Sequence, residues 1–362
     1  MVRNVLPVFA ALLLLGAGAQ AQVPQGYPAD YAKVVDAAKK EGKVVVYSTT
    51  DAAAAQPLLK DFQAAFPGIS VEYSDLNSTE LYNRFIAEVA AGSTGDVIWS
   101  SAMDLQVKLV ADGYAATYAS PEISGLPKWA VWQNQAYGTT YEPITFVYNK
   151  RLVPGEDVPQ DHTALLKLLT AKADAYKGKI TAYDPERSGV GYLFVNEDVK
   201  NFPQAWDLFK AFGKTGIKLY TSAGAMMERV TSGEHTIGYG IFGSYALGRA
   251  KKDPNLGIVM PKDYTLVTSR VMFISKQAKN PNAAKVFSDY IVSKRGQTIV
   301  ANQAELYSLR DDVEGEATVK KVKEAIGDKA RPVPIGPELL ANLDQNKRLD
   351  FLKKWQSAMK GE

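Results

Sequence analysis

The sequence contains no cysteine, which excludes a disulfide framework, a thiolate metal site and a cysteine nucleophile. It has only two histidines, His162 and His235, and neither belongs to an H-x-x-x-H pattern. It also lacks a G-x-S-x-G turn and a glycine-rich phosphate loop with its lysine. Because Asp and Glu are abundant, a paired-carboxylate hydrolase stays open. We otherwise expect no catalytic activity, no cofactor and no metal.

The chain also lacks a strong excess of charge of either sign. Lys and Arg number 42 and Asp and Glu 39, which gives a formal net charge of +3. This balance gives no electrostatic reason to expect a nucleic-acid partner. With 46% hydrophobic and 22% charged residues, the chain can bury a sizeable core. Its 362 residues exceed the usual domain size of roughly 100 to 200, so we expect two lobes.

Long hydrophobic runs are absent except at the N-terminus. Arg3 is the only charge in the first twenty-one residues, residues 6–15 are almost entirely apolar, and Ala19, Gln20 and Ala21 form an A-x-A pattern. The run is well short of the roughly 20 apolar residues that a spanning helix needs. A basic start, a short apolar centre and a small-residue exit are typical of a secretory signal peptide. We therefore predict that residues 1–21 are removed on export to the periplasm.

Strand and helix patterns alternate along the rest of the chain. Runs typical of strands occur at residues 44–47, 69–73, 96–99, 145–148, 179–183, 236–243 and 267–274. Several lead into helices: Asn77 stands three residues before Glu80 in a capping-box arrangement, and residues 281–292 have helical spacing. This alternation predicts an α/β fold with parallel-rich sheets and helices on both faces.

Two chain crossings, near Glu142 and near Gly257, would join two lobes through a hinge and leave a cleft between them. We therefore predict a discontinuous lobe 1, a lobe 2 between its two parts, and C-terminal helices that pack on the lobes. The corresponding ranges are residues 22–142 and 258–312 for lobe 1, 143–257 for lobe 2, and 313–362 for the C-terminal helices.

Hydroxyl-rich turns follow the strands of lobe 1. In open parallel sheets, ligands gather beyond the carboxyl ends of the strands, where helix N-termini present free N–H groups that favour anions. Ser and Thr also cap helices in every kind of protein, so each turn taken alone has that simpler explanation. Their recurrence at equivalent positions nevertheless predicts an anion-binding edge. The candidate residues are Ser48, Thr49, Ser78, Thr79, Ser100 and Ser101.

Other candidates lie at the first crossing and in lobe 2. Arg187 either binds a carboxylate or phosphate through its guanidinium, with Ser188 beside it, or is an exposed residue of an ordinary turn. Thr140 either lines the cleft or belongs to the hinge. Glu228 either accepts hydroxyl groups of a ligand or is solvated.

Five segments together resemble type II periplasmic solute-binding proteins of ABC transporters. Within that fold they look like the group long labelled ferric-iron-binding, which also contains hexose-phosphate receptors. The segments are residues 44–51, 81–85, 96–105, 184–191 and 238–246. The resemblance spans essentially the whole mature chain and implies two hinged α/β lobes. It implies a receptor, expected to be monomeric, that captures a small ligand and docks on an inner-membrane permease driven by an ATPase.

Iron-binding members of this group use adjacent tyrosines near the second-lobe crossing, and this sequence has no Tyr-Tyr pair. Its hydroxyl-rich turns instead suit an oxyanion. The resemblance therefore implies a receptor for a small anionic metabolite such as a sugar phosphate, with lobe 1 hydroxyls on the phosphate and Asp198 and Glu228 as candidates for the sugar hydroxyls. A ferric-iron receptor is the main alternative, and a thiamine or polyamine receptor and a secreted phosphate-ester hydrolase also stay open.

Overall fold

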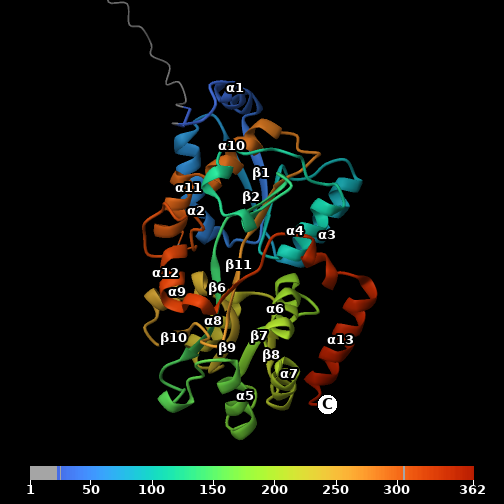
Figure 1. Cartoon of the computed structure of the whole chain (residues 1–362), viewed down its shortest axis with the longest axis vertical. Helices are drawn as coiled ribbons and strands as arrows, with labels where there is room; N and C mark the ends of the chain where they lie inside the picture. Colours follow the sequence, from blue (N-terminus) through green and yellow to red (C-terminus); the bar gives the residue numbers. More distant parts are fainter. Residues whose placement is uncertain (1–22, 25, 305) are drawn as a thin grey trace, which may run out of the picture.

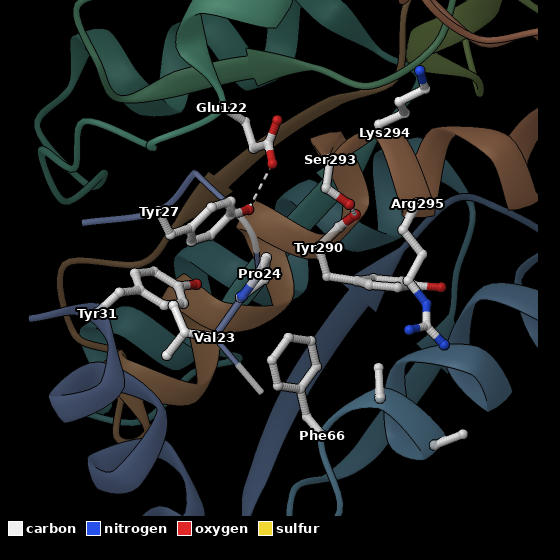
Figure 2. Close-up of a pocket in the computed structure, with 12 residues that line it drawn as sticks. Val23, Pro24, Tyr27, Tyr31, Phe66, Glu122, Tyr290, Ser293, Lys294 and Arg295 are labelled. Carbon is white, nitrogen blue, oxygen red and sulfur yellow. Dashed lines mark hydrogen bonds between the residues drawn. The ribbon is translucent and has the colours of Figure 1, made fainter. Parts of the chain in front are cut away.

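The computed structural model describes residues 23–24, 26–304 and 306–362, so the predicted signal peptide lies outside the described residues. Two α/β lobes follow one another along the long axis of the molecule, and each is built on its own sheet (Figure 1). The predicted two-lobed α/β class is therefore confirmed, although both sheets are mixed rather than parallel-rich, because the strands at the crossings pair antiparallel with their neighbours. Within the described ranges, no helix is long and apolar enough to cross a membrane.

The sheet of lobe 1 is mixed. Its strand order is β2 (Ser70–Asp75), β1 (Lys43–Ser48), β3 (Val97–Ser100), β12 (Val271–Ile274), β5 (Ala136–Gly138) and β4 (Val131–Trp132). β1 is parallel to both β2 and β3, with Ser48 opposite Asp75 and Trp99, whereas β12 is antiparallel to β3. The carboxyl ends of β1, β2 and β3 therefore meet at one edge of the sheet.

The helices of lobe 1 bury the apolar faces that the sequence predicts. In α2, Leu58 and Phe62 are fully buried. The predicted N-cap is confirmed, because the side chain of Asn77 accepts the N–H of Glu80 at 2.9 Å at the start of α3. The helical elements are α1 (Tyr31–Glu41), α2 (Ala52–Ala65), α3 (Ser78–Ala90), α4 (Met103–Ala111), η1 (Ile123–Gly125), η2 (Lys128–Ala130), α10 (Pro281–Val292), α11 (Lys294–Asn302) and α12 (Val319–Ile326).

The sheet of lobe 2 has the order β13 (Ala330–Pro332), β11 (Thr265–Thr268), β6 (Glu142–Asn149), β9 (Ile237–Phe242), β7 (Ile180–Tyr183) and β8 (Lys218–Tyr220), and β10 (Leu256–Val259) also pairs with β6. β7 is parallel to both β8 and β9. Its helical elements are η3 (Gly155–Asp157), α5 (His162–Ala171), α6 (Gly189–Asn201), α7 (Ala205–Lys214), α8 (Ala223–Ser232) and α9 (Gly243–Lys252). The carboxyl ends of β7, β8 and β9 face lobe 1.

The second crossing lies further along the chain than predicted. β10 and β11 both remain in the sheet of lobe 2, and β12 is the strand that returns to lobe 1. Residues 267–274, predicted as one strand, are therefore two strands in different sheets. They are separated at Ser269 and Arg270, where the side chain of Arg270 pairs with Glu142 of the first crossing. The first crossing lies between β5 and β6, because these two strands belong to different sheets.

The C-terminal segment contacts both lobes. β13, a strand that the charged sequence did not predict, adds to the edge of the lobe 2 sheet beside β11. After η4 (Gly327–Lys329), η5 (Pro337–Asn342) packs on α4 of lobe 1, and α13 (Gln345–Met359) packs on α7 of lobe 2 (Figure 1). Trp355 of α13 is buried against Phe209, with 5.2 Å between the ring centroids.

Candidate functional site

A cavity of about 180 Å³ lies between the two lobes at the ends of their central strands. Lobe 1 contributes the loops after β1, β2 and β3, and lobe 2 contributes the loops after β7, β8 and β9. This is the edge at which the sequence predicts a ligand. The polar lining is rich in hydroxyl groups, which come from Thr49, Ser78, Ser101, Ser188, Thr221 and Ser222.

These hydroxyl groups are fixed by the turns that carry them. In lobe 1 the hydroxyl oxygens of Thr49 and Ser101 lie 3.0 Å apart, and the N–H of Ser101 donates to the Thr49 oxygen at 2.9 Å. In lobe 2 Ser188 and Ser222 cap α6 and α8, where their oxygens accept helix N–H groups at 3.2 and 3.5 Å. A hydroxyl that accepts from a helix N–H keeps its own hydrogen for a ligand oxygen.

Three helices begin at the cavity wall. α3 starts at Ser78 in lobe 1, and α6 and α8 start directly after Ser188 and Ser222 in lobe 2. The first turn of a helix presents N–H groups and carries partial positive charge, so it stabilises an anion. Both lobes therefore direct positive potential into the same small space.

Carboxylates line the same cavity. Asp75 accepts the N–H of Ala52 at 2.9 Å, and Glu80 belongs to the cap of α3. Burial raises the pKa of Asp51, although Arg270 acts in the opposite direction. Carboxylate oxygens accept hydrogen bonds from hydroxyl groups. The cavity thus combines donors for an oxyanion with acceptors for hydroxyls.

Arg270 lies at the base of the cavity and is 1% exposed. Its Nε donates to Oε1 of Glu142 at 2.8 Å, and its Nη1 donates to Oγ1 of Thr50 at 3.1 Å. Glu142 also accepts the hydroxyls of Thr140 and Ser244. Burial lowers the pKa of Arg270, but Glu142, Tyr245 and Asp51 together raise it by more, so the guanidinium is charged. The pair joins the two crossings beneath the cavity.

The lobes are in contact around the cavity. The hydroxyl of Thr79 donates to the carbonyl of Arg187 at 3.1 Å, and the N–H of Val190 donates to the hydroxyl of Ser78 at 3.4 Å. A Cβ on Gly189 would lie 2.6 Å from a methyl carbon of Leu105 in the opposite lobe. A larger residue at this position would therefore require the Leu105 side chain to move, and the two lobes are in direct contact on this side of the cavity.

Four of the predicted residues line the cavity: Thr49, Ser78, Ser101 and Ser188. Ser48 and Ser100, each one position earlier than a lining residue, are buried instead. Their hydroxyls accept the N–H groups of Thr50 and Ala102 at 3.0 and 3.2 Å within their own turns.

Three predicted residues contribute to lobe contacts or to the crossing rather than to the cavity lining. Thr79 and Arg187 meet in the inter-lobe hydrogen bond described above, and the side chain of Arg187 is exposed. Thr140 is buried at the first crossing, where its hydroxyl donates to Glu142 at 2.9 Å. Thr140 therefore lies at the first crossing and not in the cavity lining.

Asp198 and Glu228, expected to accept sugar hydroxyls, lie away from the cavity. Asp198 is buried in lobe 2, where its two oxygens accept the hydroxyls of Tyr239 and Tyr264, each at 2.7 Å. It occupies the inward face of α6, so its acceptors are already used within the lobe. Glu228 is exposed on α8.

Sequence reasoning missed Arg270, Asp51, Asp75 and Tyr245 of the cavity wall. Arg270 is the only charged residue in the otherwise uncharged stretch 264–275, which is a signal for a buried ion pair. Asp51 and Asp75 lie at or just beyond strand ends, so the rule that selected the hydroxyl turns also applies to them. Nothing local in the sequence identifies Tyr245.

The family model of bacterial extracellular solute-binding proteins matches residues 57–326. The chain belongs to this family. The solute-binding protein is similar to the substrate binding protein of an ABC transporter from Agrobacterium tumefaciens, with 41% identity and a TM-score of 0.84 over 88% of this chain and 94% of that one. The resemblance to solute-binding proteins of ABC transporters is therefore confirmed.

Two further comparisons show more distant or partial likeness. The periplasmic binding protein AfuA from Actinobacillus pleuropneumoniae, solved with fructose 6-phosphate, shares the fold at 22% identity and a TM-score of 0.73, over 88% of this chain and 99% of that one. An uncharacterized protein of Haemophilus influenzae is 31% identical over 135 residues, which span 36% of this solute-binding protein and 38% of that relative.

The family and the fold are those of extracellular transport proteins rather than of enzymes. Across the part of the chain that the structure describes, no group of three or more His, Asp or Glu side chains is placed to hold a metal ion. What the cavity does present is a set of hydroxyl donors, helix N-termini and carboxylates.

Proposed function

We propose that this solute-binding protein captures a phosphorylated small metabolite, with a sugar phosphate as the best match, and delivers it in the periplasm to an ABC permease. The observation that carries the proposal is the meeting of α3, α6 and α8 N-termini from both lobes in one hydroxyl-lined cavity. Closure of the lobes would surround a phosphate with donors from two sides. The fold likeness to a protein solved with fructose 6-phosphate supports that compound as a probe.

The rest of the cavity suits the sugar part of such a ligand. Asp51, Asp75 and Glu80 supply acceptors for hydroxyl groups. The volume of about 180 Å³ lies below the roughly 300 to 1,000 Å³ of sites for drug-sized molecules, which favours a small metabolite. A ligand with an anionic end and a hydroxyl-bearing body uses both kinds of group.

The residues that line this cavity are less suited to binding a ferric ion. Tyr183 and Tyr245 both line the cavity, and with Asp51 they are its candidate iron ligands. Among the described residues, no group of three or more His, Asp or Glu side chains is placed to hold a metal ion beside them. Helix N-termini also favour an anion over a cation.

The neighbouring serines Ser101 and Ser100 provide a matched test. Ser101→Ala removes a hydroxyl from the cavity wall, and we expect it to weaken binding of fructose 6-phosphate about tenfold to a hundredfold, as for a hydrogen bond to a charged group. Ser100→Ala removes a hydroxyl that lies outside the cavity lining, and should change affinity by less than about threefold. Titration calorimetry of the wild type and both variants measures this. Equal affinities for all three proteins would contradict the proposed phosphate site.

A further inference from the structure

A second cavity, of about 350 Å³, adjoins the first. Asp51 of lobe 1 and Tyr245 of α9 border both cavities. The second cavity is lined further by Arg249 and Lys252 of α9 and by Gln303 of lobe 1. The second cavity is therefore separated from the proposed ligand site by a single contact between the lobes, which Asp51 and Tyr245 form.

That contact consists of two hydrogen bonds. The hydroxyl of Tyr245 accepts the N–H of Asp51 at 3.1 Å and donates to Oδ1 of Asp51 at 3.3 Å. Burial raises the pKa of Tyr245, so its hydroxyl keeps the proton that it donates. Because the two residues belong to different lobes, any opening of the lobes would break this contact.

The ring of Tyr245 is held from two directions. The guanidinium carbon of Arg270 lies 5.1 Å from the ring centroid, and the ring of Phe242 packs at 6.1 Å between centroids. Arg270 is itself fixed by Glu142 at the crossings. The Tyr245 ring is therefore held in place between the two cavities. A ligand that extends from the first cavity into the second must break the contact between Tyr245 and Asp51.

The two cavities differ in charge. Asp51 lines both cavities; the first is lined in addition by Asp75, Glu80 and Arg270, whereas the second has Arg249 and Lys252 on its wall. Arg249 donates through Nη2 to the hydroxyl of Thr231 at 2.7 Å. Its buried Nε has no hydrogen-bond partner among the residues that the structure describes. The second cavity thus suits an anionic group.

We propose that Tyr245 limits the length of ligand that the first cavity accepts, so that the protein binds sugar monophosphates in preference to sugar bisphosphates. A second phosphate on the far side of the sugar would project between Tyr245 and Asp51 and prevent the lobes from completing their contact. The basic second cavity would accept that phosphate only when the tyrosine ring is removed. This inference rests on the proposed function of the first cavity.

The test compares the affinities for fructose 6-phosphate and fructose 1,6-bisphosphate by titration calorimetry. We expect the wild type to prefer the monophosphate by about tenfold or more, and Tyr245→Ala to shift this ratio at least about tenfold towards the bisphosphate. Tyr245→Phe retains the ring that fills the space, so its ratio should stay within about threefold of the wild-type ratio. The double variant Tyr245→Ala, Lys252→Gln should lose part of the affinity for the bisphosphate that Tyr245→Ala gains.

Each outcome has a separate meaning. Equal affinity of the wild type for both sugars, or an unchanged ratio in Tyr245→Ala, would overturn the role of Tyr245 and leave the proposed function intact. Loss of affinity for both sugars in Tyr245→Ala, with the ratio unchanged, would show that the residue only stabilises the closed form. A wild type that binds neither sugar would refute the proposed function, and the selectivity with it.

Discussion

Arg270→Ala lowers the free energy of unfolding by about 3–5 kcal/mol, because it leaves the carboxylate of Glu142 buried without its cation. Glu142 is 0% exposed and would retain only the hydroxyl donors of Thr140 and Ser244. Both crossings and the base of the cavity depend on this pair. Guanidinium denaturation of the wild type and the variant measures the loss.

Two further variants distinguish the loss of the buried ion pair from the general effect of replacing an arginine by alanine. Arg295 pairs with Asp61 through two hydrogen bonds but is 59% exposed, so Arg295→Ala should cost no more than about 1 kcal/mol. The double variant Arg270→Ala, Glu142→Gln removes the buried charge and should recover a substantial part of the stability. A double variant less stable than Arg270→Ala would contradict this explanation.

Asp104 makes the stability of the folded protein fall as the pH rises from 5 to 8. It is 1% exposed in the first turn of α4, where Oδ1 accepts the N–H of Leu105 at 2.9 Å. Its Oδ2 is buried without a hydrogen-bond partner among the described residues. Burial raises the pKa of Asp104 to about 7, with Glu197 acting in the same direction and Arg348 opposing it.

The direction of this pH dependence follows from the number of protons that the folded and unfolded states bind. Between the ordinary pKa of 3.8 and about 7, the folded protein binds the Asp104 proton and the unfolded chain does not, so raising the pH favours unfolding. Over pH 5 to 8 the contribution is about 2–3 kcal/mol. We expect Asp104→Asn to remove this contribution, so that its stability relative to the wild type improves between pH 5 and pH 8.

Denaturation of both proteins at the two pH values gives the measurement. Asp207→Asn, in the exposed first turn of α7, is the matched control and should change stability by less than about 0.5 kcal/mol at either pH. A difference between Asp104→Asn and the wild type that is the same at pH 5 and pH 8 would contradict a buried, titrating carboxyl group.

Local patterns in the sequence are sufficient for much of the fold and for one side of the site. The N-cap at Asn77 and the hydroxyls of Thr49 and Ser101 could be predicted, because strand ends and helix starts have local signatures. The sequence did not decide between Ser100 and Ser101, since both follow the same strand. Which of the two faces the cavity depends on the alternation of side chains at the strand end.

Long-range pairing explains what could not be predicted. Arg270 meets Glu142 from a distant part of the chain, and that contact accompanies the change of lobe between β11 and β12. Asp198 has the hydrogen-bonding capacity of a ligand-binding carboxylate, but two tyrosines from other elements occupy it. The Tyr245 contact with Asp51 exists only where two lobes meet, so no pattern within either segment indicates it.

The central claim is that the cavity between the lobes binds a phosphorylated sugar. It is tested most directly by the thermal stability of the protein from residue 22 onward, measured with fructose 6-phosphate, fructose and ferric citrate. We predict that fructose 6-phosphate at a thousandfold excess over its dissociation constant stabilises the protein by about 4 kcal/mol and that fructose has little effect. Stabilisation by ferric citrate alone would contradict the account and would assign the cavity to a metal held by Tyr183 and Tyr245.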